Sequence, residues 1–424
     1  MRKEPGLPMP DNNEKLVKML KYVSEHNDFY KKRIKEYGIS NPLDITQWPV
    51  LTRKELQENR YNMFSDGYLS KYYNNSLHRQ TSSGSSGIPV DVYWDYCDYY
   101  ASVVKLWRYR KRFYDIDPKD KYVKFTLSSF NATDGASFKY IAINDNILNV
   151  NISLIKNDAD YDKIVALIED FRPRWLYIQP FVLYKLLDSS VRLNQKLPNS
   201  IKYIESVGEL LPESLKKLAL DYFHIPITNM YGSEEMNCIA YETPSKKMNI
   251  LCDNVYVECL CSNGICKCGE GSAIITSLTN KAMPLIRYDQ NDYISLSTSN
   301  EACRLNLGAQ IISVIKGRVH ECIDLFDGKK ISTFTLSEII AETNNLYNGA
   351  ITCFKFTYTK SQKKLQCAVT LVDSKNNWFE SISNTLKSLL SFKISKDNGF
   401  EFIVKKVETF AQDPQKHSYL EIID

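Results

Sequence analysis

The sequence predicts a mixed α/β fold with a separate, smaller α+β domain at its carboxy-terminal end. Helical patterns over residues 13–36 and 161–170 alternate with short apolar runs that are typical of strands, at residues 122–127, 175–178 and 201–206. Of the 424 residues, 43% are hydrophobic and 12% are aromatic, which is enough to build a large buried core. This length and composition predict a folded chain of more than one domain.

The region after residue 322 has its own order of elements. A short strand is followed by a turn and by alternating helix and strand patterns, at residues 323–325, 327–328, 336–343, 350–359, 365–371 and 378–391. This order predicts a compact α+β domain of about a hundred residues. Upstream of it, residues 255–278 favour a small antiparallel β region, because strand-like runs there flank a turn signal.

Charge and hydropathy exclude several kinds of partner. The net charge is +4 and the basic residues are spread along the chain, so they predict no nucleic-acid face. No apolar run that would make a signal peptide follows the first residues, and no apolar stretch reaches the roughly eighteen residues of a membrane span. We therefore expect a cytoplasmic protein that inserts into no membrane. A homodimer is left open.

Four of the eleven cysteines lie in one short segment, at Cys259, Cys261, Cys266 and Cys268. The pair Asn263-Gly264 is a strong hairpin signal, and a two-residue loop there would place Cys261 opposite Cys266 and Cys259 opposite Cys268. All four sulfurs would then lie on one face of the ribbon. A tetrathiolate zinc site, disulfides and ordinary reduced thiols are the alternatives. We expect reduced thiols, with structural zinc as the functional alternative.

Residues 81–89 form the most informative segment, because small hydroxyl residues and glycines dominate it. Glycine lets the backbone approach an anion closely, successive N–H groups form a concave nest, and serine hydroxyls add donors. The run lacks the ending of a P-loop and the spacing of a dinucleotide fingerprint, and the strand-like residues 90–94 after it argue against a flexible linker. The residues expected to hold phosphate are Thr81, Ser82, Ser83, Gly84, Ser85, Ser86 and Gly87.

This run resembles the phosphate loop of adenylate-forming enzymes, and further motifs of that family follow in the same order. Residues 231–235, Tyr-Gly-Ser-Glu-Glu, resemble the aromatic-Gly-x-Ser/Thr-Glu segment, and residues 287–292 resemble the Arg-Tyr-x-x-Gly-Asp segment. Residues 317–321 are similar to the hinge between the two domains of the family, and Lys416 stands where the small domain offers its lysine. Residues 22–30, 48–56 and 206–209 look like the phenylacetate–coenzyme A ligase and CapK-like branch. The resemblance covers nearly the whole chain.

The resemblance implies a role for each matching residue. The loop from Thr81 to Gly87 would hold the β- and γ-phosphates of ATP, and Glu235 would hold Mg²⁺. Asp292 would anchor the ribose, and Lys416 would be the catalytic lysine. The residues expected to line the nucleotide site are Gly208, Glu209, Tyr231, Gly232 and Ser233. Arg318 is expected at the hinge, and Arg287 would brace the ribose region, with a structural ion pair as the alternative.

The family pattern also implies a domain organisation. Residues 1–317 would form a large, multi-sheet adenylation domain with a small β region, and residues 318–424 would form a small mobile lid. Five positions depart from the pattern, namely Ile88, Glu234, Asn291, His320 and Gln415. Asn291 is the mildest change, because asparagine tolerates the left-handed backbone better than other non-glycine residues do. His320 either makes the hinge sensitive to pH or is an ordinary exposed histidine.

The function implied by the resemblance is the ATP-dependent activation of a carboxylic acid. An acyl-adenylate would form with release of pyrophosphate, and the acyl group would pass to the thiol of coenzyme A or a carrier protein, or to an amine. An aryl or amino acid is the expected substrate. The departures from the pattern motivate the alternative of a non-catalytic nucleotide-binding or scaffold homologue.

Overall fold

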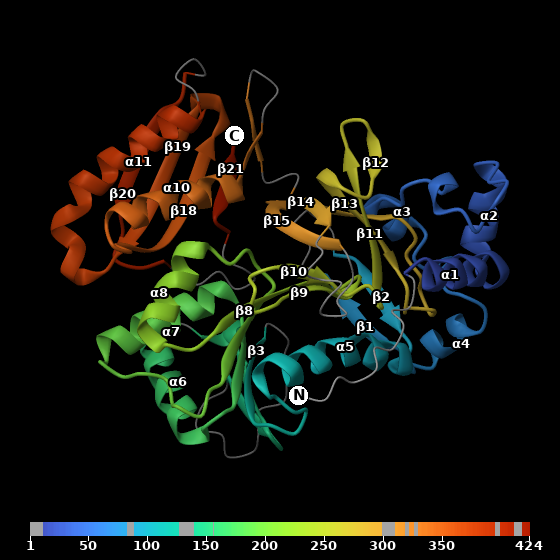
Figure 1. The fold of residues 1–424 in the computed structure, drawn as a ribbon, viewed down its shortest axis with the longest axis horizontal. Coiled ribbons are helices and arrows are strands. Elements are labelled where there is room, and N and C mark those ends of the chain that lie inside the picture. Colours follow the sequence, from blue (N-terminus) through green and yellow to red (C-terminus); the bar gives the residue numbers. More distant parts are fainter. Residues whose placement is uncertain are drawn as a thin grey trace. The chain divides into compact units, whose positions relative to one another are not determined.

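The computed structural model describes residues 12–82, 89–126, 140–155, 157–298, 310–318, 322–325, 330–394, 399–410 and 418–424 (Figure 1). The chain divides into two compact units. The first unit comprises Met1–Asp115 and Met230–Ile315, and the second comprises Ile116–Asn229 and Lys316–Asp424. A compact unit need not coincide with a domain that moves, so a lid that begins at residue 318 stays a prediction.

The first unit is built on a sheet whose strands follow the order β12-β11-β13-β14-β15-β10-β9-β8. These strands are β8 (Ile227–Ser233), β9 (Asn237–Glu242), β10 (Met248–Ile250), β11 (Val255–Cys261), β12 (Gly264–Cys266), β13 (Gly269–Ser277), β14 (Tyr288–Thr298) and β15 (Gln310–Arg318). Its helices are α1 (Asn12–His26), α2 (Asp28–Glu36), α3 (Arg53–Glu58), α4 (Tyr68–Tyr73) and α5 (Tyr96–Tyr114), with a short 3-10 turn at Ile45–Gln47. A separate antiparallel hairpin joins β1 (His78–Thr81) to β2 (Asp91–Trp94).

The helix predicted over residues 13–36 is two helices, because Asn27 interrupts it. Asn27 has an extended backbone, and its side chain accepts a hydrogen bond from the Tyr30 N–H and so caps α2. The Asn27 side-chain amide also donates to the Met63 carbonyl at 2.9 Å. The buried amide is thus satisfied from both sides, and this tertiary contact decides where α1 ends.

The amino-terminal part of the second unit is a mostly parallel sheet with the order β7-β6-β3-β5-β4. The strands are β3 (Tyr122–Thr126), β4 (Ile141–Asn144), β5 (Ile147–Asn151), β6 (Trp175–Ile178) and β7 (Tyr203–Val207). Only the β4–β5 pair is antiparallel among the pairings of these five strands. The helices are α6 (Asp158–Phe171), α7 (Pro180–Arg192) and α8 (Glu213–Phe223). The predicted alternation of helices and strands is confirmed here.

The carboxy-terminal part of the second unit forms a four-stranded sheet of its own, with the order β20-β19-β18-β21. Figure 1 shows α10 and α11 beside this sheet. The elements are β16 (Cys322–Asp324), β17 (Lys330–Ser332), α10 (Thr333–Leu346), β18 (Ile351–Thr359), β19 (Lys364–Leu371), α11 (Phe379–Ile394), β20 (Glu401–Lys406) and β21 (Leu420–Ile423), with 3-10 turns at Lys360–Gln362 and Asp373–Trp378. Apolar side chains from both helices and from the sheet share one core. The predicted α+β region is therefore confirmed, while its predicted turn at residues 327–328 lies outside the described residues.

None of the helices in the described ranges is both long and apolar enough to cross a membrane.

The cysteine-rich segment forms the predicted hairpin, but in a different register. Cys259 lies opposite Cys266 and Cys261 lies opposite Gly264, so the loop is Ser262-Asn263. The other edge of β11 pairs with β13 along Val255–Leu260, and this longer pairing sets the position of the strand. The predicted opposition of Cys259 and Cys268 is therefore wrong.

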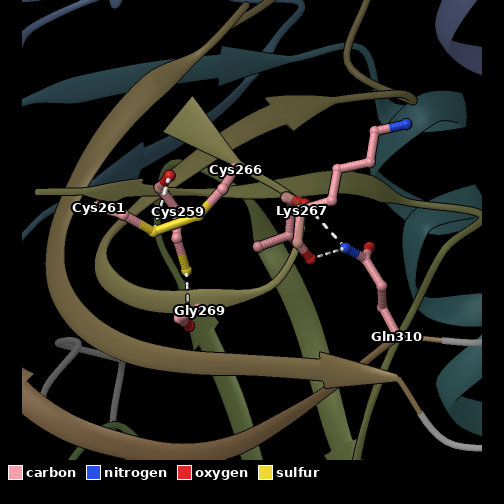
Figure 2. Close-up of a disulfide and its surroundings, with 7 residues drawn as sticks. Cys259, Cys261, Cys266, Lys267, Gly269 and Gln310 are labelled. Atoms are coloured by element: carbon pink, nitrogen blue, oxygen red, sulfur yellow. Dashed lines mark hydrogen bonds between the residues drawn. A yellow bond between two sulfur atoms is a disulfide. The ribbon is translucent and has the colours of Figure 1, made fainter. Parts of the chain in front are cut away.

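The new register places Cys261 diagonally across from Cys266, and the two form a disulfide with a Cα–Cα distance of 6.6 Å (Figure 2). Cys259 and Cys268 are free thiols. Among the described residues, no three His, Cys, Asp or Glu side chains gather as a metal site would require. Two of the four residues expected to bind zinc are joined to each other in this structure, and a zinc site stays a prediction. The expectation of reduced thiols is wrong for Cys261 and Cys266 and holds for the other two.

Candidate functional site

The Ser/Gly run is closed at its base by the β1–β2 hairpin. The Ser82 N–H donates to the Val90 carbonyl at 2.9 Å, and the Val90 N–H donates to the Ser82 hydroxyl at 2.9 Å. The described residues on either side of the run, Ser82 and Val90, are therefore bonded to each other. Residues 83–88, which include the expected phosphate-binding residues Ser83, Gly84, Ser85, Ser86 and Gly87, lie outside the described residues.

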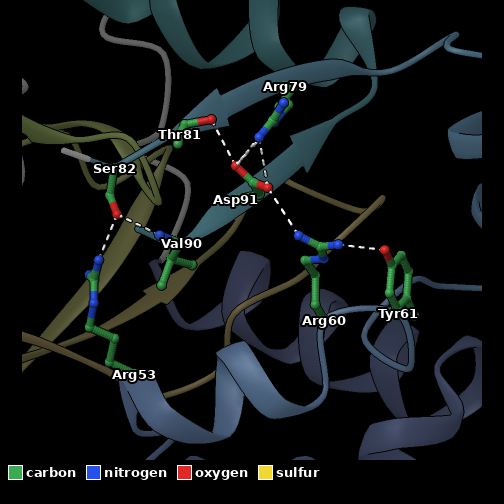
Figure 3. Close-up of polar contacts among 8 residues, drawn as sticks. All are labelled: Arg53, Arg60, Tyr61, Arg79, Thr81, Ser82, Val90 and Asp91. Atoms are coloured by element: carbon green, nitrogen blue, oxygen red, sulfur yellow. Dashed lines mark hydrogen bonds and ion pairs between the residues drawn. The ribbon is translucent and has the colours of Figure 1, made fainter. Parts of the chain in front are cut away.

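A buried carboxylate, Asp91, holds the hairpin together (Figure 3). The Arg79 guanidinium donates to both oxygens of Asp91 at 2.9 and 3.0 Å, and Arg60 donates to one of them at 3.1 Å. The Thr81 hydroxyl donates to the same carboxylate at 2.7 Å. Thr81 is thus tied to the base of the loop, and a direct contact with phosphate stays a prediction for it.

Arg53 connects the base of this loop to Glu235, the residue expected to hold Mg²⁺. Its Nη2 donates to the Ser82 hydroxyl at 2.6 Å, and its Nη1 donates to Glu235 Oε1 at 3.0 Å. Arg53 is the first residue of α3, whose start is fixed by a reciprocal capping box between Thr52 and Glu55. The cap therefore sets the position from which the guanidinium reaches both partners.

Glu235 is buried, with 3% of its surface exposed, so its charge needs compensation within the protein. Arg53 supplies a positive charge, and the Tyr288 hydroxyl donates to the same carboxylate oxygen at 3.3 Å. Burial raises the pKa of Tyr288, which keeps its hydroxyl protonated and able to donate. The bonds that the described residues make to Glu235 go to Oε1.

A second polar pair joins Tyr231 on β8 to Asp292 on β14. The Tyr231 hydroxyl donates to Asp292 Oδ2 at 2.7 Å, and both side chains are buried. Asn291, next to Asp292, has a φ of +58°, a left-handed backbone that asparagine tolerates better than other non-glycine residues do. The residues expected near the adenine and the ribose are thus in direct contact.

Gly232 and Ser233 shape the end of β8. A Cβ atom added at Gly232 would lie 2.4 Å from the Asn237 carbonyl oxygen, so only glycine fits where β8 approaches β9. The Ser233 hydroxyl accepts a hydrogen bond from the Met236 N–H at 3.2 Å and donates one to the Gln290 side-chain oxygen at 3.2 Å. These contacts turn the chain so that Glu235 follows directly after the strand.

Arg287 has a structural partner. Its guanidinium makes two bonds to Glu258, at 2.6 and 2.9 Å, and donates to the Trp48 carbonyl at 2.9 Å, and all these groups are buried. The sequence analysis gave a structural ion pair as the alternative role of Arg287, and the pair with Glu258 is such an ion pair. A role beside the ribose stays a prediction for Arg287.

The remaining expected residues belong to the second unit. Gly208 has a φ of +82°, and the Glu209 carboxylate accepts a hydrogen bond of 3.4 Å from the Phe181 N–H at the start of α7. A carboxylate is favourable at that position because the positive end of the helix dipole lies there. Arg318 is the last residue of β15, and its carbonyl accepts a bond from the Cys322 thiol at 3.5 Å. Lys416 and His320 lie outside the described residues.

Sequence reasoning missed Arg53 and Tyr288 as members of the site. The Thr-x-x-Glu pattern at Thr52 and Glu55 does signal a helix that starts at Arg53. Arg53 and Glu235, however, are 182 positions apart in the chain, and no local pattern reports such a contact. Only the fold brings them together.

Comparison with known proteins finds matches among solved structures. No family model matches the sequence, and no curated protein matches it. Among solved structures, a 2-hydroxyisobutyryl-CoA ligase in the postadenylation state, in complex with R3-HIB-AMP, matches with a TM-score of 0.75 at 17% identity. The match covers 97% of this chain and 89% of that chain. The chain has the fold of this ligase.

Two more distant structures share the fold. An anthranilate CoA ligase, AuaEII, in complex with anthranoyl-AMP has a TM-score of 0.55 at 13% identity, over 81% of this chain and 66% of that one. The amide bond synthetase McbA from Marinactinospora thermotolerans has a TM-score of 0.53 at 13% identity, over 80% and 67% of the two chains. The predicted fold class, a large α/β part with a small α+β carboxy-terminal part, is therefore confirmed.

Proposed function

We propose that this protein is an ATP-dependent acid ligase that forms an acyl-adenylate and releases pyrophosphate. The observation that carries the proposal is the contact of Arg53 with both Ser82 and Glu235, which joins the base of the Ser/Gly loop to the expected metal carboxylate. The fold shared with a CoA ligase, an aryl-acid CoA ligase and an amide bond synthetase supports it. Residues 22–30, 48–56 and 206–209 favour the phenylacetate–CoA ligase and CapK-like branch.

The proposed reaction begins when the substrate carboxylate attacks the α-phosphorus of ATP. The P–O bond to pyrophosphate breaks, and the acid becomes a mixed anhydride with AMP. Positioning and charge neutralisation supply most of the acceleration in such transfers. Lys416 would bridge the carboxylate and the α-phosphate, because its ammonium is a compact charge on a long stem.

Magnesium fits the residues present. Mg²⁺ is usually held by one or two carboxylates together with phosphate oxygens and water, and when bound it neutralises charge on the phosphates. Glu235 offers one buried carboxylate beside the base of the loop, and this matches a site completed by ATP. Tyr231 and Asp292 would hold the nucleoside, since their hydrogen bond fixes the phenol and the carboxylate relative to each other.

The acceptor is a thiol or an amine. The solved structures with this fold include CoA ligases and an amide bond synthetase, so the fold serves both kinds of acceptor. We propose that residues 318–424 form the lid that rotates about Arg318 between the two half-reactions. We also propose a cytoplasmic location, as expected from the sequence.

Acid-dependent exchange of labelled pyrophosphate into ATP tests the proposal. The wild-type protein, with Mg²⁺ and a panel of aryl, aliphatic and amino acids, is expected to catalyse exchange with one class of acid. Lys416→Ala is the matched control and is expected to reduce exchange by about 100-fold or more, in line with the loss of a charge that stabilises the transition state. Binding of ATP without exchange for any acid would favour the non-catalytic homologue instead.

A further inference from the structure

We propose that Arg53 is a ligand of the ATP triphosphate that neutralises Glu235 in the nucleotide-free protein and exchanges it for phosphate when Mg²⁺ and ATP bind. The proposal rests on the proposed function, since it assigns a new residue to the same site. In this proposal Arg53 is bonded to Glu235 when the nucleotide is absent and to the triphosphate when ATP is bound.

The position of Arg53 between two functional elements is the first reason. The two terminal nitrogens of its guanidinium serve different partners, with Nη1 on Glu235 at 3.0 Å and Nη2 on Ser82 at 2.6 Å. The Arg53 side chain is 15% exposed, and that of Glu235 is 4% exposed. The pair therefore lies at the inner end of the site, where charge interactions are weakly screened by water.

The bonding of Ser82 is the second reason. Its hydroxyl oxygen accepts hydrogen bonds from the Val90 N–H and from Arg53, at 2.9 and 2.6 Å. An oxygen that accepts from two donors directs its own hydrogen to a third group. Arg53 thus holds Ser82 so that the O–H points away from both donors, as a hydroxyl that donates to a phosphate must.

Charge makes the exchange of partners necessary. A divalent cation on Glu235 would stand next to the Arg53 guanidinium, and two positive groups at such a distance repel each other. The carboxylate satisfies the metal better than the hydrogen bond does, so Arg53 is released. A released guanidinium beside Ser82 would meet the triphosphate, whose oxygens match its planar fork.

The other two arginines near the hairpin do not share this arrangement. Arg79 and Arg60 both bind Asp91, whereas Figure 3 shows Arg53 bonded to Ser82. Asp91 is not an expected metal ligand, so nothing displaces its arginines. Arg79 is therefore a matched control, because it is also an arginine bonded to this hairpin, although it lies on β1 and Arg53 lies on α3.

Calorimetric binding of two probes tests the proposal. The first probe is ATP with Mg²⁺, and the second is Mn²⁺ without nucleotide, as a stand-in for Mg²⁺. Arg53→Gln is expected to weaken ATP binding about 10- to 100-fold, the loss expected for hydrogen bonds to a charged ligand. The same variant is expected to bind Mn²⁺ about tenfold more tightly, because the cation no longer competes with the guanidinium for Glu235.

Two control variants define the result. Arg79→Gln is expected to leave both affinities within about twofold, since the Arg79 side chain is 58% exposed and Arg60 still compensates Asp91. Arg53→Lys keeps the charge but cannot reach two partners, so it is expected to bind Mn²⁺ like the wild type and ATP more weakly. Arg53→Lys also serves if Arg53→Gln does not fold, which thermal melting will show.

Weaker ATP binding together with tighter Mn²⁺ binding by Arg53→Gln distinguishes a ligand of ATP from a residue with a structural role alone. If Arg53→Gln and Arg53→Lys bind ATP like the wild type, the proposal is overturned while the proposed function stands. If ATP and Mn²⁺ affinities fall together, Arg53 only keeps Glu235 in place and the proposal is again overturned. If the wild type binds no ATP, the proposed function itself fails.

Discussion

The Tyr231 hydroxyl donates a 2.7 Å hydrogen bond to the Asp292 carboxylate, and 7% of the Asp292 surface is exposed. We expect Tyr231→Phe to lower the free energy of unfolding by about 1–3 kcal/mol, because a buried acceptor loses a donor. The ring is retained, so apolar packing is kept. Urea denaturation at neutral pH measures the change.

Asp292→Asn provides the comparison for this hydrogen bond. The asparagine oxygen still accepts from Tyr231, so the free energy of unfolding should fall by about 1 kcal/mol or less. ATP binding should nevertheless weaken, since an amide accepts from ribose hydroxyls less strongly than a carboxylate does. Equal stability of Tyr231→Phe and the wild type would show that the bond contributes nothing to folding.

The ion pair between Arg287 and Glu258 predicts a large loss of stability. Both side chains are buried and the closest N–O distance is 2.6 Å. Arg287→Met leaves Glu258 as a buried, uncompensated charge, so we expect the free energy of unfolding to fall by about 3–5 kcal/mol. Replacing both partners, as in Arg287→Met with Glu258→Leu, should recover much of that loss. If Arg287→Met is as stable as the wild type but binds ATP poorly, its role is at the ribose instead.

The elements that the sequence predicted correctly are those with strong local patterns. The strand at Trp175–Ile178 is where the apolar run predicts it, and the left-handed backbone of Asn291 is one that asparagine tolerates. The errors arise where distant contacts decide. Asn27 divides a continuous helical pattern because its side chain is bonded to Met63, and the pairing of β11 with β13 shifts the cysteine hairpin away from its local turn signal.

In the site too, local patterns were predicted correctly and contacts between distant residues were not. Each short motif could be found, because its residues adjoin one another in the chain. The ion pair of Arg53 with Glu235 could not, since a charge alone does not identify its partner among the many carboxylates of the chain. For the same reason, the sequence could not decide whether Arg287 forms a structural ion pair, and it could not identify Glu258 as the partner.

The disulfide between Cys261 and Cys266 predicts the thiol content. Because Cys261 and Cys266 are joined, unfolded protein purified without reductant should react with two equivalents of a thiol reagent fewer than the same protein after reduction. The variant Cys261→Ala with Cys266→Ala should lose this difference, whereas Cys268→Ala should keep it. Cytosolic thiols are usually kept reduced, so eleven thiols in cells quenched rapidly with acid would indicate that the bond forms only after lysis.

Asp253 predicts how the first unit responds to acid. Lys15 on α1 and Lys105 on α5 contact its two carboxylate oxygens, at 2.7 and 3.1 Å. Burial acts to raise the pKa of Asp253, but the hydrogen bond from Lys15 and the charge of Lys105 outweigh it, so the pKa is lowered. A carboxyl group with a lowered folded pKa stabilises the protein above its unfolded pKa of about 3.9 and loses that contribution as the pH falls below it.

Asp253→Asn therefore should be less stable than the wild type at neutral pH, and the difference should shrink as the pH falls from about 4 to about 2. Denaturant unfolding of both proteins at several pH values measures this difference. Asp28, an exposed carboxylate on α2 paired with Lys31, gives a control in Asp28→Asn, for which we expect little change at any pH because surface pairs contribute little. A difference between Asp253→Asn and the wild type that stays constant down to pH about 2 would mean that packing, and not the charge of Asp253, joins α1 to α5.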